Sequence, residues 1–230
     1  MQKNKYLIGI DTETSNSLID ENDKLDLTQS LVYDIGWQVI DKKGKVYKKR
    51  SYVVAEIFLD KELMNTAYFK EKIPQYWEDI KSGRRVLKTL LNIRRQFMFD
   101  RKKYNTSVVF AHNALFDWRA LNNTLRFVTG SKYRYFFPRS VEIWDTLKMS
   151  HDVFGKKKEY TLFCDEHGFK TKHKVPQNRF TAEILYRFIS GDCNFVESHT
   201  GLEDVEIESI ILVYCLKSKM EMRRLLFDRE

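Results

Sequence analysis

The sequence has few cysteines, no long apolar run and no signal-peptide pattern. Its three cysteines, Cys164, Cys193 and Cys215, are far apart and odd in number, which argues against both a disulfide framework and a cysteine-based zinc site. No stretch approaches the length of a membrane span, and residues 1–5 are a short polar segment that leads into apolar residues. We therefore expect a reduced protein of a bacterial or virus-infected host cytoplasm, with no membrane partner.

The chain also lacks internal repeats, low-complexity runs and a convincing interdomain linker. Its 230 residues are 43% hydrophobic and 14% aromatic, which is enough to bury a sizeable core. We expect a single domain over residues 1–230. A long polar loop at 14–30 and an enlarged segment at 55–83 are predicted to lie within it.

Apolar periodicity and turn residues predict the secondary structure. Strands are expected at 6–13, 31–40, 45–54, 107–111 and 141–145, and helices within 56–82 and at 84–101, 116–128, 146–154, 161–168, 180–189 and 201–227. Three strands followed by alternating helix and strand favour an α/β fold. Its core would be a mixed five-stranded sheet with helices on both faces.

The charge distribution suggests a polyanionic partner. The formal net charge is +8, and the basic residues gather at 42–50, 84–103, 156–158 and 170–174. Interleaved Tyr and Phe make these clusters together suitable for a nucleic-acid groove, although each cluster alone is more typical of a solvated surface. Against this background, residues 197–208 carry five acids in twelve residues.

The first acidic signal is Asp11-Thr-Glu13, directly after a short apolar run. Side chains alternate along a strand, so Asp11 and Glu13 project from the same face. Two neighbouring carboxylates repel each other, and a divalent metal ion commonly offsets that repulsion. The alternative is an acidic strand end that opens into solvent.

The second acidic signal follows the strand at 107–111, where a short connection delivers Asp117 into the first turn of a helix. The helix dipole favours a carboxylate there by about 0.3–1 kcal/mol. Asp117 could therefore be a site residue or only a helix-terminal acid.

The third signal lies at 197–208. Thr200-x-x-Glu203 fits a capping box, which predicts Thr200 as the N-cap of a helix that begins at Gly201. His199 then lies just outside the helix and Asp204 beside its buried face. A histidine held next to such an acid can act as a general base. The alternative is an exposed histidine before a capped acidic helix.

Together the three segments resemble the DEDDh, or DnaQ-like, 3′→5′ exonucleases of the ribonuclease H-like superfamily. The family has three acidic motifs in this chain order, and the match spans nearly the whole sequence. The matching segments are Asp11-Thr-Glu13, His112-Asn-Ala-Leu-Phe-Asp117 and His199-Thr-Gly-Leu-Glu-Asp204.

The resemblance implies a site for two Mg²⁺ or Mn²⁺ ions, held by Asp11, Glu13, Asp117 and Asp204. It implies that His199 takes a proton from the attacking water, so that nucleoside 5′-monophosphates leave the 3′ end. The terminal nucleotide would contact Thr12, Thr14, Asn113 and Phe116. Asp145 is expected to be structural, and His112 to stabilise a loop.

The expected substrate is single-stranded DNA or a frayed 3′ end, as in proofreading, and a polymerase would have to be a separate chain. RNA is the alternative substrate, because the same catalytic residues serve both and 2′-hydroxyl recognition is not readable from the sequence. An alternative of another class is a non-catalytic nucleic-acid-binding module.

Overall fold

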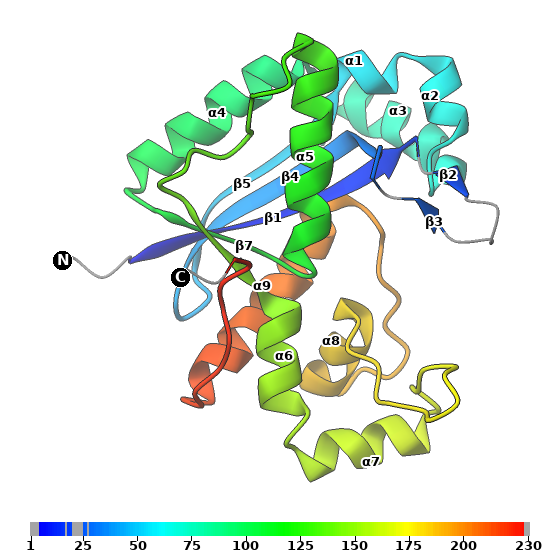
Figure 1. Cartoon of the computed structure of the whole chain (residues 1–230), viewed down its shortest axis with the longest axis vertical. Coiled ribbons are helices and arrows are strands. Elements are labelled where there is room, and N and C mark those ends of the chain that lie inside the picture. The colour runs from blue at the N-terminus through cyan, green and yellow to red at the C-terminus, as the bar shows by residue number, and fades with distance from the viewer. Residues whose placement is uncertain (1–4, 17, 20–24, 27, 228–230) are drawn as a thin grey trace.

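In the computed structural model the chain is organised around one mixed sheet with helices on both faces (Figure 1). The structure describes residues 5–16, 18–19, 25–26 and 28–227. The strand order is β6-β5-β4-β1-β7-β8. The strands are β1 (Tyr6–Ser15), β4 (Leu31–Asp41), β5 (Val46–Val54), β6 (Val86–Lys88), β7 (Val108–Ala111) and β8 (Glu142–Asp145), with β2 (Leu18–Ile19) and β3 (Leu25–Asp26) forming a separate small pair.

The predicted α/β class and mixed sheet are confirmed. β4 pairs antiparallel with both β1 and β5, whereas β7 lies parallel to β1 and β8 parallel to β7. The helical elements are α1 (Ala55–Phe58), α2 (Lys61–Asn65), the 3-10 turn η1 (Lys70–Lys72), α3 (Ile73–Ser82), α4 (Leu90–Lys103), α5 (Ala114–Thr129), α6 (Thr146–Phe154), α7 (Lys158–Glu166), α8 (Ala182–Ser190) and α9 (Gly201–Lys217). None of the described helices is both long and apolar enough to cross a membrane.

The central strand β1 separates two apolar cores because its side chains alternate between the faces of the sheet. Ile8 and Ile10 pack with residues of α4 and α5, whereas Leu7 belongs to the core under α6, α8 and α9. In Figure 1, α5 accordingly crosses in front of the sheet and α9 lies behind it. Asp11 and Glu13 continue the Leu7 series and so face α9.

Two predicted helix boundaries are wrong by several residues. The expected helix at 84–101 begins only at Leu90, because Val86–Lys88 pairs in parallel with β5 and forms a sixth strand. The last helix ends at Lys217 instead of residue 227. After it, Lys219 has a positive φ of 54°, and Leu225 and Leu226 return to form backbone contacts with β8.

The expected loop at 14–30 is partly strand. β1 extends through Ser15, and the β2–β3 pair lies within the segment, while residues 17, 20–24 and 27 are outside the described part of the chain. The segment at 55–83 is helical, as predicted. Pro74 lies in the first turn of α3, where it needs no helical hydrogen bond, so it begins this helix instead of interrupting it.

Candidate active site

Three carboxylates from β1 and α9 converge at one point. Oxygens of Asp11, Glu13 and Asp204 all lie within 4.8 Å of one another. Glu13 and Asp204 are buried, at 8% and 5% exposed, and Asp11 is half-buried, so this is not an acidic strand end that opens into solvent. The β1 alternation and the first turn of α9 bring together three of the acids that the sequence suggested.

A close backbone approach places α9 against β1. Gly36 on β4 is the register partner of Asp11. A Cβ on Gly36 would lie 2.1 Å from the backbone nitrogen of Leu202, and one on Gly201 would lie 3.0 Å from the carbonyl oxygen of Asp11. Only glycine permits this contact at both positions. Both glycines stand out in the sequence, Gly36 inside a buried strand and Gly201 directly after an N-cap. Their role is visible only in the tertiary structure, where the two backbones meet.

Asp117 enters from the other side of the strand end. It lies in the first turn of α5 and is 2% exposed, and Thr12 donates a hydrogen bond of 2.8 Å from its hydroxyl to Asp117 Oδ1. Burial raises the pKa of Asp117 to about 7, against hydrogen bonds from Thr12 that lower it. Asp117 is therefore a buried, held carboxylate rather than a solvated acid at a helix end.

The beginning of α9 is built differently from the predicted capping box. Thr200 is the N-cap, as predicted, but its side chain accepts no backbone hydrogen bond. Its hydroxyl donates to Glu203 Oε2 at 2.8 Å, and its backbone N–H donates to Asp204 Oδ2 at 3.0 Å. Ser198 donates its hydroxyl to Asp204 Oδ1 at 3.1 Å. These bonds fix the Asp204 carboxylate from both of its oxygens.

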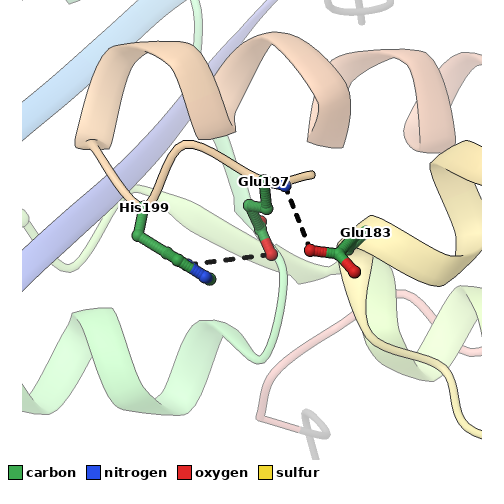
Figure 2. A group of neighbouring side chains, drawn as sticks. All are labelled: Glu183, Glu197 and His199. Atoms are coloured by element: carbon green, nitrogen blue, oxygen red, sulfur yellow. Dashed lines mark hydrogen bonds and ion pairs between the residues drawn. The ribbon is translucent and has the colours of Figure 1, made fainter. Parts of the chain in front are cut away.

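His199 occupies a left-handed backbone conformation, with φ 48°, directly before the helix. Its Nδ1 lies 4.0 Å from Glu197 Oε2, and Glu197 in turn donates its backbone N–H to Glu183 Oε2 at 3.0 Å. Figure 2 shows the imidazole directed toward this acidic pair. Burial and then Lys72 lower the pKa of His199, so the ring is neutral at pH 7 and able to accept a proton.

The enlarged segment at 55–83 contributes to the site, which the sequence analysis did not foresee. The ring of Phe69 stacks on His199, with centroids 4.3 Å apart and planes 10° from parallel. Lys72 donates its ammonium to the carbonyl oxygen of Ser198 and lowers the pKa of the buried Glu13. Phe69 and Lys72 thus both contact the loop before α9. No local sequence motif identifies either of them.

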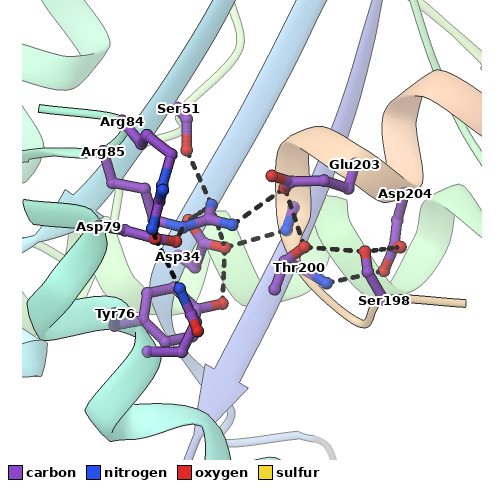
Figure 3. A network of polar contacts seen from close by, with 12 residues as sticks. Asp34, Ser51, Tyr76, Asp79, Arg84, Arg85, Ser198, Thr200, Glu203 and Asp204 are labelled. Atoms are coloured by element: carbon purple, nitrogen blue, oxygen red, sulfur yellow. Dashed lines mark hydrogen bonds and ion pairs between the residues drawn. The ribbon is translucent and has the colours of Figure 1, made fainter. Parts of the chain in front are cut away.

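A buried polar network links that segment to α9 (Figure 3). Arg85 is 4% exposed and donates to Asp34, Ser51, Asp79 and Glu203. Asp34 Oδ2 also accepts the hydroxyl of Tyr76 and the backbone N–H of Gly201. The network therefore fixes the N-terminus of α9 through the Gly201 N–H and the Glu203 carboxylate.

The site gathers several acidic side chains in a largely buried place. Burial raises the pKa of Asp11 and of Glu13 well above their usual ranges, and neighbouring acids raise both further. Burial also raises the pKa of Asp204 to about 7 and that of Glu197 to about 8. Carboxylates in this arrangement are all ionised only when additional positive charge is present, and a divalent cation supplies it.

The acids open into a cavity of about 620 Å³ between β1, the first turn of α5, α6, α9 and the 171–182 segment. Thr12, Asn113 and Phe116 line it, together with His199 and Arg179. Thr14 does not occur among the described lining residues; it is 3% exposed, and its carbonyl oxygen accepts the backbone N–H of Tyr68. The cavity brings the other three predicted substrate contacts to one place.

Two further expectations agree with the geometry. Asp145 caps α6 by accepting the backbone N–H of Leu147 at 2.9 Å and also accepts that of Asn113, so it serves the backbone. His112 contacts Thr146 Oγ1 at 3.0 Å and the carbonyl oxygen of Phe180 at 2.7 Å, which fixes the loop before α5. Neither belongs to the three-acid group.

The sequence analysis named neither Glu197 nor Glu208 as a site residue, although both line the cavity. Glu208, on α9, is 3% exposed and lines the same cavity as Asp11 and Asp204. The sequence signal was its spacing of four residues from Asp204, which places both on one face of the helix.

Comparison with known proteins gives structural matches only. No family model matches the chain, and no curated protein matches its sequence. Escherichia coli ExoI in a zinc-bound complex with single-stranded DNA superposes with a TM-score of 0.50 at 11% identity, over 94% of this chain and 41% of that one.

Two further structures are similar in outline. Exonuclease X bound to duplex DNA with a 5′ overhang gives a TM-score of 0.47 at 15% identity, over 93% and 92% of the chains. Pop2p of S. pombe, with Mg²⁺ and Mn²⁺ bound, gives 0.49 at 12% identity, over 93% and 83%. The match to ExoI shows a shared α/β fold, and in this respect the resemblance to ribonuclease H-like exonucleases is confirmed.

Proposed function

We propose that this protein is a metal-dependent 3′→5′ exonuclease that releases nucleoside 5′-monophosphates from single-stranded or frayed DNA ends. The observation that carries the proposal is the convergence of Asp11, Glu13 and Asp204 in a largely buried group, with oxygens within 4.8 Å. The shared fold with ExoI, described in complex with single-stranded DNA, supports the choice of substrate.

The residues present fit Mg²⁺ or Mn²⁺. The group offers only carboxylate oxygens, which these hard cations prefer, and no thiolate lies within it. Asp11, Glu13 and Asp204 would hold one ion, and Asp117 would serve a second that shares Asp11. When bound, two such ions supply positive charge to both the attacking and the leaving oxygen of an in-line displacement at phosphorus.

The chain's own residues handle the proton and the orientation. His199, neutral at pH 7 and stacked on Phe69, accepts the proton of the attacking water. Thr12 directs the Asp117 carboxylate by its hydrogen bond. Asn113 and Phe116 line the cavity, where they would contact the sugar and base of the terminal nucleotide.

The testing experiment is digestion of matched DNA and RNA oligonucleotides of one sequence, labelled at either end, with Mg²⁺ and with chelator. We expect Mg²⁺-dependent loss of a 3′ label at once and a descending ladder from a 5′ label. Asp11→Asn should abolish cleavage. Asp192→Asn is the matched control, because Asp192 is exposed and the one hydrogen bond of its side chain within the described part of the chain, from the backbone N–H of Asn194, survives in the amide.

Three results would contradict the proposal. Full cleavage in chelator would exclude the metal mechanism, and cuts in a circular single strand would indicate an endonuclease. Tight, Mg²⁺-independent binding of single strands without cleavage would indicate a binding module. Faster digestion of the RNA strand would indicate that RNA is the preferred substrate. The proofreading role and the separate polymerase chain stay predictions, to be tested after the polarity is known.

A further inference from the structure

Glu208 lies one helical turn beyond Asp204 on α9 and has no role in the four-carboxylate arrangement. It is 3% exposed and contributes to the wall of the cavity that also contains Asp11 and Asp204. A spacing of four residues on a helix puts the two side chains on the same face. Glu208 therefore points at the site and not at solvent.

The two oxygens of Glu208 differ. The carboxylate receives a hydrogen bond from the backbone N–H of His112. Its Oε2 is fully buried and has no hydrogen-bond partner among the described residues. A buried carboxylate oxygen without a partner is costly, and native proteins rarely retain one without a use.

The charges around Glu208 indicate which part of the site it serves. Beyond burial, Asp117 and then Asp204 raise its pKa, and Glu208 in turn raises that of Asp11. The leading acidic neighbour of Glu13 is instead Asp204. Among the neighbouring acids, Asp117 therefore acts most strongly on both Glu208 and Asp11.

We propose that Glu208 is a fifth carboxylate of the metal centre and donates its unpartnered Oε2 to the divalent cation on the Asp117 side of Asp11. The assignment rests on the proposed function for the existence of a second cation. It gives that cation two protein acids, Asp117 and Glu208, besides the shared Asp11. The purely structural alternative is that Glu208 only accepts the backbone N–H of His112.

Calorimetric titration of the full chain with Mn²⁺, alone and with deoxythymidine 5′-monophosphate, separates the two roles. Glu208→Gln keeps the size of the side chain and an oxygen for the His112 N–H but removes the charge. We expect the weaker Mn²⁺ site to lose at least tenfold in affinity, in keeping with the sensitivity of metal sites to their supporting groups. Glu206→Gln is the control, on the same helix but 43% exposed and paired with Lys49 at the surface.

Thermal melts make the result interpretable. In chelator, Glu208→Gln should melt close to the wild-type temperature, because the amide matches the side chain in size and keeps an oxygen for the His112 N–H, and Mn²⁺ should stabilise it less than wild type. If that variant fails to fold, Glu208→Asp keeps the charge and withdraws the oxygen by one methylene, and should weaken the same site.

Unchanged Mn²⁺ stoichiometry and affinity in Glu208→Gln would overturn the assignment. Failure of the nuclease proposal would look different. A wild-type protein that binds two Mn²⁺ ions, loses one in Glu208→Gln, and leaves both DNA and RNA intact would refute the enzyme and keep Glu208 as a ligand.

Discussion

Replacing Arg85 by Met tests how the candidate site is held together. The guanidinium is 4% exposed and contacts two buried acids, with Nη1 3.2 Å from Asp34 Oδ2 and Nε 3.0 Å from Asp79 Oδ2. It also donates to Ser51 and Glu203. Methionine has a similar length but removes one charged donor from each of these acceptors.

The expected cost at neutral pH is about 3–5 kcal/mol of the free energy of unfolding, the usual effect of removing one partner of a buried ion pair. Asp34 keeps two donors, the Tyr76 hydroxyl at 2.7 Å and the Gly201 N–H at 2.9 Å, which favours the lower half of that range. Arg84→Met is a matched control. Arg84 contacts the same Asp79 but its side chain is 63% exposed, so we expect a loss of about 1 kcal/mol or less.

The loss should depend on pH with a defined sign. Burial raises the pKa of Asp34, and Arg85 is the leading group that lowers it, so removing Arg85 raises that pKa further. A group whose pKa is higher in the folded state stabilises the protein below its unfolded pKa and loses that contribution as pH rises through its folded pKa. The gap between Arg85→Met and wild type should therefore narrow as pH falls toward 4.

Urea unfolding followed by circular dichroism, at pH 8 and at pH 5 without metal, measures both effects. The double variant Asp34→Asn, Arg85→Met should recover part of the loss, because it removes the unpaired charge. A loss below about 1 kcal/mol at pH 8, or an equal loss at both pH values, would refute the buried-pair argument.

Three other outcomes follow from the site. Without metal, the free energy of unfolding should fall as pH rises from about 4 through about 7, because Asp117 and Asp204 have raised folded pKa values of about 7. Thermal melts with and without Mg²⁺ at pH 5.5 and at pH 8 should therefore show stabilisation by the metal only at the higher pH. Gly36→Ala places a Cβ 2.1 Å from the Leu202 nitrogen, so α9 must move, and Mn²⁺ affinity measured by calorimetry should fall with cleavage. His199→Ala should cleave about 10²–10⁴-fold more slowly, with unchanged Mn²⁺ affinity and a residual rate that rises with pH. Asp204→Ala should instead lose metal affinity and cleavage together. A wild-type cleavage rate in His199→Ala would show that His199 is not the general base.

The sequence predicted those parts of the fold that depend on local pattern. Apolar runs and turn residues identified the hairpin of β4 and β5 and the alternation that puts Asp11 and Glu13 on one face. Thr200 was placed correctly as the N-cap of α9 because its neighbours carry the signal locally. Predictions of this kind need only neighbours along the chain.

Elements that depend on distant partners were not predictable. Residues 86–88 look helical in isolation but form β6, because β5 offers an edge for parallel pairing. The chain after Lys217 continues a helical pattern, yet Leu226 is 7% exposed through its return to β8. In both cases tertiary hydrogen bonds outweigh a propensity difference of a few tenths of a kcal/mol per residue.

The sequence by itself determined the chemistry available to this protein, since Asp11, Glu13, Asp117, His199 and Asp204 are visible as motifs in chain order. Only the tertiary structure decided how that chemistry is held. The supporting residues come from segments up to 167 positions apart, as in the hydrogen bond from the Gly201 N–H to Asp34. Their effect arises from burial and mutual distance, which no sequence spacing records, and the same is true of the unpartnered oxygen of Glu208.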